Sequence, residues 1–414
     1  MNRIEYMDNI DIKVGDNIWQ DGNAKEITFI VTKDCQLACK YCYLVGKNTQ
    51  ERMSWSVAKQ AIDYILDNEQ DFKQESVVWD FIGGEPFLEI DLIDKICDYI
   101  KTELFRRNHH WFNSYRFSFS TNGINYHEEK IQKFIEKNEA HLSIGITIDG
   151  TKEKHDLNRI WKGGEKERGS YDDVVRNIPL WLEQFPNAAT KVTISSADIP
   201  YIKESVLHLY SLGIHEVSIN CVFEQVWKEG DDKRFEDQLM QLADAIIDNE
   251  LYKDYACSFY TEHMGKPMDC VHENQNWCGA GRMLAIDAAG NFYPCTRFAQ
   301  YSLRDKKAWI IGNVNDGIDK NKIRPFLTLD RCTQSSQECI DCEVASGCAW
   351  CQGENYDAAD TATIYQRATA ICKMHKARVR ANNYYWNKLY RKLELEGERE
   401  EYENNKKKSN DVIC

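Results

Sequence analysis

Three closely spaced cysteines offer the clearest chemistry in this chain. Cys35, Cys39 and Cys42 lie in the run Asp34-Cys-Gln-Leu-Ala-Cys-Lys-Tyr-Cys-Tyr43, directly after an apolar stretch. Three thiolates can hold three irons of a cubane cluster, whereas an electron-transfer [4Fe-4S] site normally uses four cysteines. The fourth iron would stay open for another ligand. A zinc knuckle or a disulfide is the alternative, but zinc needs a fourth ligand nearby, and the next Cys or His downstream is Cys97.

Polar turns follow the next two predicted strands. Gly83-Gly84-Glu85-Pro86 follows the second strand, where two glycines permit positive φ and close backbone approach, while Glu85 could anchor the turn. The third strand ends Ser120-Thr121-Asn122-Gly123, whose hydroxyl and amide groups could reach a ribose or a carboxylate. An ordinary Asn-Gly turn is the alternative.

Two further strands end on candidate site residues. The fourth ends Thr147-Ile148-Asp149-Gly150, and the loop after it reads His155-Asp156-Leu157-Asn158-Arg159. Asp149 could contact a cofactor or substrate and Arg159 could bind a carboxylate, or the two could form a structural ion pair. Ser195, at the end of the fifth strand, is a weaker candidate for a carboxylate contact.

A second group of cysteines lies between residues 270 and 372. In the run Cys339-x2-Cys342-x5-Cys348-x2-Cys351, only five residues separate the two pairs, whereas a two-knuckle zinc pattern leaves about 15–20. A zinc ribbon is therefore disfavoured, although zinc in one of the sites stays an alternative. The density of cysteines predicts a metal-organised domain, with cysteines at positions 270, 278, 295, 332, 339, 342, 348, 351 and 372.

Strands and helices alternate along the first half of the chain, as in βα units around a parallel sheet. Six predicted strands fall short of an eight-stranded barrel, so we expect an α/β fold with a partial, TIM-like (β/α)6 barrel that is open on one side. The active site of such a barrel lies at the C-terminal ends of the strands, where the first cysteines stand. The predicted strands are 27–31, 77–82, 116–121, 142–148, 191–195 and 216–220, and the helices are 54–67, 90–106, 128–137, 171–183 and 202–212.

The predicted organisation has five parts. An N-terminal extension (1–25) precedes the barrel (26–222). A helical bridge (223–269), with a helix over 224–249, leads to the small cysteine-rich domain (270–375). A C-terminal helix over 382–399 and a tail complete the chain (376–414).

Composition excludes several classes of function. The chain has 414 residues, of which 43% are hydrophobic, enough for a folded core. It has no apolar signal segment and no apolar run of about 18 residues, so we expect a cytoplasmic protein without membrane spans, where reduced thiols can bind metals. A net charge of −14 argues against nucleic acid as a partner.

The C-x3-C-x2-C run, with Tyr41 before its third cysteine, resembles the radical S-adenosylmethionine (SAM) superfamily. The resemblance implies that Cys35, Cys39 and Cys42 bind a [4Fe-4S] cluster whose open iron chelates SAM. Gly83-Gly84-Glu85 resembles the GGE motif of that superfamily, and the Asp149 to Arg159 stretch resembles members that act on peptides. By resemblance, the SAM-binding residues are Tyr41, Gly83, Gly84, Glu85, Ser120, Asn122, Asp149 and Ser195.

The later cysteines resemble the SPASM domain, which carries two auxiliary [4Fe-4S] clusters. Auxiliary cluster I would use Cys278, Cys295, Cys351 and Cys270. Alternatively, Cys332 could replace Cys270, or the site could have only three cysteines and an open iron that binds a substrate thiolate. Auxiliary cluster II would use the remaining four, Cys339, Cys342, Cys348 and Cys372. The chain departs from the family in having two residues between Cys348 and Cys351, where the family usually has three.

The resemblance implies hydrogen abstraction from a substrate carbon by a radical that comes from SAM. Sulfatase-maturating enzymes place an aspartate after the cysteine that aligns with Cys295, whereas Thr296 and Arg297 stand here. The segments 35–47 and 346–351 resemble thioether-forming maturases of the ranthipeptide and sactipeptide type. We therefore expect a cysteine-containing precursor peptide as substrate and a flavodoxin or ferredoxin-type reductant. The alternatives are carbon–carbon crosslinking or epimerisation of a peptide, or a non-catalytic electron-transfer or zinc protein.

Overall fold

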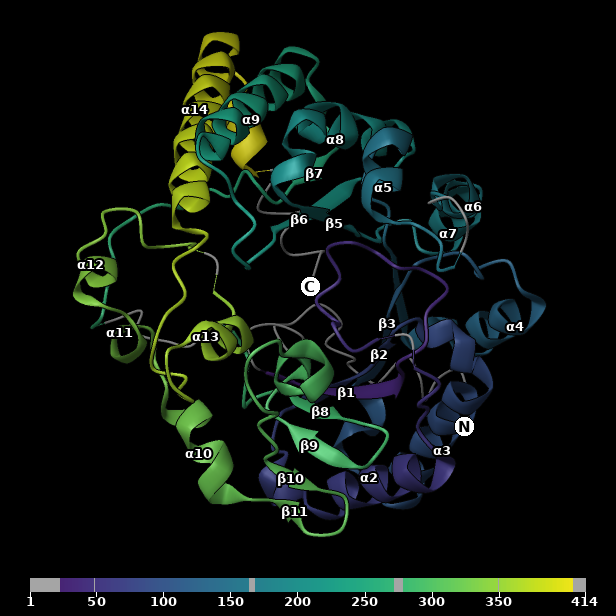
Figure 1. The fold of residues 1–414 in the computed structure, drawn as a ribbon. Coiled ribbons are helices and arrows are strands. Elements are labelled where there is room, and N and C mark those ends of the chain that lie inside the picture. The colour runs from purple at the N-terminus through teal and green to yellow at the C-terminus, as the bar shows by residue number, and fades with distance from the viewer. Residues whose placement is uncertain (1–22, 48, 164–167, 272–277, 349, 405–414) are drawn as a thin grey trace.

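The computed structural model describes residues 23–47, 49–163, 168–271, 278–348 and 350–404 (Figure 1). Nearly all of the predicted N-terminal extension, and the tail beyond residue 404, lie outside these ranges. Within them, no helix has both the length and the apolar character needed to span a membrane.

Four parallel strands form one side of the barrel. They are β1 (Ala24–Thr32), β2 (Ser76–Gly83), β3 (Tyr115–Thr121) and β4 (Leu142–Ile146). The register aligns Ile27, Trp79 and Phe117 in one buried row, because alternate residues of a strand share a face. The opposite face carries the polar row Thr28, Asp80 and Ser118. The sheet therefore packs apolar side chains on one side and presents polar ones on the other.

The barrel is split between its fourth and fifth strands. β5 (Thr190–Ile194), β6 (Glu216–Cys221) and the short β7 (Ala256–Cys257) form a separate parallel sheet. All six predicted strands are present, and the predicted α/β fold with a parallel sheet is confirmed.

Helices α2, α3 and α4 lie along the outer side of β1–β4 (Figure 1). The predicted helix over 171–183 is wrong as a single element: it is two helices, α6 and α7, with Pro179 in the first turn of α7. Proline lacks the N–H that a continuous helix would need and suits a new first turn. The helices of this half are α2 (Trp55–Asp67), α3 (Ile90–Arg106), α4 (Glu129–Asn138), α5 (Lys152–Asn158), α6 (Tyr171–Val175), α7 (Ile178–Gln184) and α8 (Ile202–Ser211).

The second half of the chain extends the first sheet. β8 (Leu284–Ile286) pairs in parallel with β1, and antiparallel β9 (Asn291–Tyr293), β10 (Gly312–Asn313) and β11 (Gly317–Ile318) continue outward. The first sheet therefore runs through the predicted domain boundary at residue 270, and it fixes the cysteines that flank β8 and β9 relative to those that follow β1.

The remaining elements of the second half of the chain are helices. α9 (Asp231–Asp248) packs against the long α14 (Cys372–Glu396), where Tyr384 donates a hydrogen bond to Asp244 at 2.6 Å. α14 begins ten residues before the predicted helix and ends at Gly397, which has a left-handed φ of 71°. Between them lie α10 (Lys320–Thr328), α11 (Arg331–Gln334), α12 (Gln337–Ile340) and α13 (Gln352–Ala358).

Candidate cofactor and metal sites

The first cysteine set lies in the loop after β1, in backbone contact with the glycine turn after β2. Gly84 N–H donates to the carbonyl of Thr32 at 3.0 Å, and Glu85 N–H donates to that of Asp34 at 2.9 Å. A Cβ at Gly84 would lie 2.0 Å from the Asp34 oxygen, so only glycine permits this approach. The two turns form one unit at the C-terminal ends of β1 and β2.

Glu85 ties this unit to the end of β3. Its buried carboxylate accepts hydrogen bonds from Thr121 Oγ1 at 2.6 Å and from the backbone N–H groups of Asn122 at 2.7 Å and Phe87 at 3.1 Å. Burial raises the pKa of Glu85, although these donors lower it. Because its hydrogen-bond partners are all protein groups, the Glu85 carboxylate holds the glycine turn against the end of β3.

Asn122 stands beside the first cysteine set, whereas Ser120 does not. The Asn122 amide donates to Gln36 at 3.1 Å and lies 3.9 Å from Cys35 Sγ. Ser120 accepts a hydrogen bond from Lys191 at 3.2 Å across the barrel interior. Of these two predicted cofactor residues, Asn122 is the one beside the cysteines.

A buried polar triad borders Cys39. Tyr41 donates to Asp149 at 2.5 Å and accepts from Arg159 at 3.0 Å, and Asp149 is fully buried. Burial alone would raise the pKa of Asp149, but Lys154 and Arg159 keep it below its usual value. The triad supports the end of the fourth predicted strand as part of the site, with Asp149 already paired.

Ser195 is engaged in a helix cap. Its hydroxyl and its backbone N–H both donate to Asp198, at 2.6 Å and 2.7 Å. This capping box starts the turn after β5, so the hydroxyl of Ser195 has a structural partner.

The later cysteines gather in two sets. The first of these comprises Cys278 before β8, Cys295 after β9 and Cys351 before α13. Burial raises the pKa of Cys295, and the neighbouring Cys278 and Cys351 raise it further. The other set surrounds α12 and the start of α14; burial raises the pKa of Cys348, and its neighbours Cys372, Cys339 and Cys342 also raise it. These are the two groups that the sequence analysis assigned to auxiliary clusters, except for Cys270.

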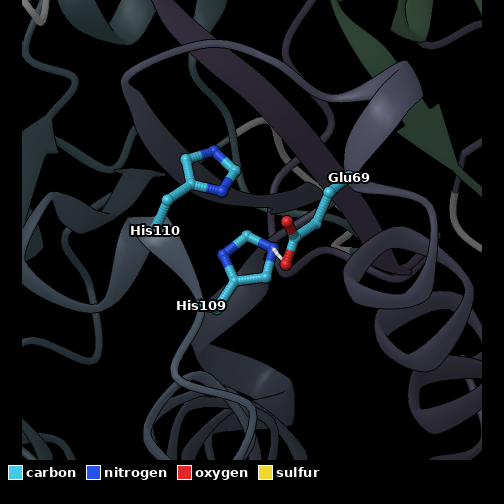
Figure 2. A group of neighbouring side chains, drawn as sticks. All are labelled: Glu69, His109 and His110. Atoms are coloured by element: carbon cyan, nitrogen blue, oxygen red, sulfur yellow. Dashed lines mark ion pairs between the residues drawn. The ribbon is translucent and has the colours of Figure 1, made fainter.

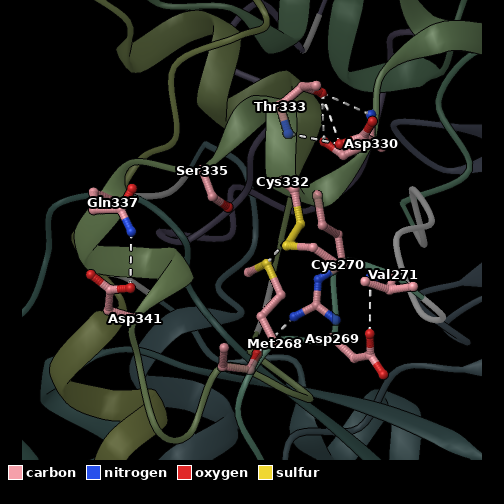
Figure 3. The surroundings of a disulfide bond; sticks show 12 residues. Met268, Asp269, Cys270, Val271, Asp330, Cys332, Thr333, Ser335, Gln337 and Asp341 are labelled. Carbon is pink, nitrogen blue, oxygen red and sulfur yellow. Dashed lines mark hydrogen bonds between the residues drawn. A yellow bond between two sulfur atoms is a disulfide. The ribbon is translucent and has the colours of Figure 1, made fainter.

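Cys270 forms a disulfide with Cys332, 62 residues away (Figure 3). The Cys332 sulfur lies 3.5 Å from Met268 Sδ. This pairing contradicts the predicted ligand role of Cys270 and the substitute role of Cys332, because a disulfide sulfur is no longer a thiolate. The second set then has three cysteines.

Sulfur spacing distinguishes a cluster from a single metal ion. A zinc ion bound at about 2.3 Å would hold thiolates about 3.8 Å apart. Among the described residues, no three cysteine sulfurs lie within 4.8 Å of one another. In the described part of the chain, the sulfurs of each set are therefore spaced more widely than a tetrahedral zinc site requires.

Each set also has a neighbouring arginine with a buried nitrogen that lacks a hydrogen-bond partner among the described residues. These atoms are Arg159 Nε, Arg297 Nε and Arg367 Nη2. Arg159 interacts with Cys39, Arg297 with Cys351 and Arg367 with Cys348. Positive donors beside three thiol sets fit an anionic group with acceptor atoms, such as an iron–sulfur cluster.

A fourth group of possible ligands does not suit a metal. Glu69, His109 and His110 bring donor atoms within 4.8 Å before β2 and β3, at the N-terminal edge of the sheet (Figure 2). His109 Nδ1 accepts from Trp111 N–H at 3.2 Å, so the neutral ring carries its proton on Nε2, which lies 3.7 Å from Glu69. That nitrogen has no lone pair to offer. We interpret this group as the cap of a short helix.

Tyr43, Thr296 and Arg297 join the first and second sets, a role that the sequence did not predict for them. Tyr43 is hydrogen-bonded to Thr296, and burial raises its pKa to about 12. The Arg297 guanidinium lies 4.9 Å from the Tyr43 ring and pairs with Glu224 and Glu354. Their only sequence signal is position, since Tyr43 follows Cys42 and Arg297 stands two residues after Cys295.

Comparisons with known proteins agree with this arrangement. Residues 29–213 match the family model of the Radical SAM superfamily. A cysteine-type anaerobic sulfatase-maturating enzyme from Clostridium perfringens is 23% identical over 355 residues, which are 78% of this chain and 88% of that enzyme.

Two solved structures share the fold. Native anSMEcpe with bound AdoMet superposes with a TM-score of 0.64 at 17% identity, over 90% of this chain and 99% of the other. Streptococcus suis SuiB bound to its precursor peptide SuiA gives a TM-score of 0.55 at 15% identity, over 84% of this chain and 75% of the other.

Proposed function

We propose that this chain is a radical SAM enzyme that joins a cysteine sulfur of a precursor peptide to a carbon of the same peptide, forming a thioether. The observation that carries the proposal is the grouping of ten cysteines into three sets, with the first set against the Gly83-Gly84 turn. One set would serve SAM, and the other two would hold auxiliary [4Fe-4S] clusters.

The residues of the first domain have separable roles. Cys35, Cys39 and Cys42 would bind the first cluster, and the close-packed turn at Gly83 and Gly84 would present backbone groups to SAM. Glu85 holds that turn against Asn122 through the bond at 2.7 Å. Asn122 and Tyr41, beside the cysteines, would complete the cofactor pocket. When bound, the cluster and SAM supply a carbon radical that abstracts hydrogen from a substrate carbon.

A peptide substrate is supported by what similar proteins bind. The relative from Clostridium perfringens matures sulfatases by its name, and SuiB was solved with a precursor peptide. Thr296 and Arg297 occupy the place where sulfatase-maturating enzymes have an aspartate, and Thr296 already pairs with Tyr43. We therefore favour a different outcome from formylglycine formation. A flavodoxin or ferredoxin-type protein would supply the electron.

Mass spectrometry of a cysteine-rich precursor peptide tests the proposal. The reconstituted enzyme, SAM and a reductant should remove two hydrogens from the peptide and leave one thiol fewer for alkylation by iodoacetamide. Loss of two hydrogens with every thiol still alkylated would instead show a carbon–carbon crosslink. An unchanged mass with a D-residue would show epimerisation.

A further inference from the structure

Arg297 places a buried positive charge beside the second cysteine set. It follows Cys295 by two residues, and its side chain is 15% exposed. A Cβ added at Gly353, two residues after Cys351, would lie 2.3 Å from the Arg297 Cβ. The Cβ end of the Arg297 side chain therefore packs closely against the segment that follows Cys351.

Surrounding groups fix the guanidinium. Its Nη2 donates to Glu224 at 2.9 Å and to Glu354 at 3.2 Å, and its central carbon lies 4.9 Å from the Tyr43 ring centroid. Glu354 is 5% exposed and is also held by Arg304 at 2.7 Å. If Arg297 moved into solvent, Glu224 would lose this partner and Glu354 would keep only Arg304. Loss of a partner is costly for carboxylates that are this little exposed.

We propose that Arg297 raises the reduction potential of the auxiliary cluster at Cys278, Cys295 and Cys351, and that Glu224 opposes this effect. The inference rests on the proposed function, which places a cluster there. One-electron reduction adds a negative charge to the cluster, and a nearby buried cation stabilises that charge more strongly than it would in water. A carboxylate in the same network acts with the opposite sign.

The third cysteine set provides a matched control within the chain. Its own arginine is Arg367, whose guanidinium carbon lies 4.9 Å from the Trp350 ring and which interacts with Cys348. If proximity of charge governs each potential, Arg367 acts on the third set and Arg297 on the second.

A redox titration of the reconstituted full-length protein tests the inference. Dithionite reduction is followed by electron paramagnetic resonance in wild type, Arg297→Gln, Arg297→Lys, Glu224→Gln and Arg367→Gln. We expect Arg297→Gln to move the midpoint of one auxiliary signal to a more negative potential and Glu224→Gln to move the same signal to a more positive one. Arg297→Lys retains the positive charge, so its midpoint potential should stay close to that of the wild type. Arg367→Gln should shift the other auxiliary signal.

Iron and sulfide content separates the outcomes. If iron content is unchanged and neither Arg297→Gln nor Glu224→Gln moves a midpoint, the inference is wrong while the proposed function stands. If Arg297→Gln loses the cluster, the midpoint potential of Glu224→Gln becomes the deciding measurement. A shift of that midpoint to a more negative potential would overturn the inference. A wild type that binds only about four irons, one cluster, refutes the proposed function and the inference together.

Discussion

At the scale of single residues, the absence of a side chain at position 84 is what lets two loops meet. The Gly84 Cβ position lies 2.0 Å from the carbonyl oxygen of Asp34, the residue before Cys35. Any substitution must therefore push the cysteine loop or the glycine turn away from its place. The effect on the site comes from backbone displacement, with no loss of a functional group.

We expect Gly84→Val to weaken SAM binding by at least roughly tenfold, which is about 1.4 kcal/mol. Gly145 in β4 is the matched control, because a Cβ there meets its nearest atom at 3.6 Å, so Gly145→Ala should bind SAM normally. Equilibrium dialysis measures both affinities. Unchanged binding by Gly84→Val would mean that this turn has no part in the cofactor site.

At the scale of elements, the polar row inside the barrel makes stability depend on pH. Burial raises the pKa of Asp80 to about 6, and burial together with Asp80 raises that of Glu26 to about 7. The folded state thus keeps protons that the unfolded chain releases near pH 4. Stability should therefore fall as pH rises from about 4 to about 7.

Asp80→Asn should flatten this fall, because asparagine has no proton to lose. Urea denaturation should show that the variant's free energy of unfolding, relative to that of the wild type, is higher at pH 8 than at pH 4. Asp305→Asn, at an exposed position, should leave the pH profile unchanged. Parallel profiles for Asp80→Asn and wild type would show that the barrel interior does not hold these protons.

The disulfide between Cys270 and Cys332 links two segments of the second half. Closing a loop of 62 residues stabilises a fold by up to about 4 kcal/mol through the unfolded state. Cys332→Ser should lower the free energy of unfolding by an amount of this order without loss of iron. If Cys270→Ser instead removes iron and Cys332→Ser does not change stability, Cys270 is a ligand after all.

Much of the barrel could be predicted because its strands and helices carry clear periodic patterns. The break between α6 and α7 depended on Pro179, a single residue inside an otherwise helical pattern. The short strands β8–β11 carry no such pattern, so their pairing with β1 was not foreseen. The resemblance to radical SAM and SPASM proteins predicted the three cysteine sets, but the link between Cys270 and Cys332 depends on tertiary contacts that the motifs do not contain.

At the scale of the whole molecule, the continuous sheet links the segments that carry the first and second cysteine sets. β1 leads to the first set, its partner β8 follows Cys278, and β9 leads to Cys295. Tyr43, next to Cys42, and Arg297, two residues after Cys295, then contact each other at 4.9 Å. We propose that the boundary between the two predicted domains is therefore a functional junction, in which a substrate can meet the first cluster and an auxiliary one.

The most direct test of this account is 5′-deoxyadenosine formation from SAM by the reconstituted protein, measured together with iron content. The wild type should bind about twelve irons, three clusters, and produce 5′-deoxyadenosine under reducing conditions. Replacing Cys35, Cys39 and Cys42 together by alanine should remove about four irons and abolish the product, because the other sets have separate ligands. Undiminished 5′-deoxyadenosine production by the triple variant would contradict the account.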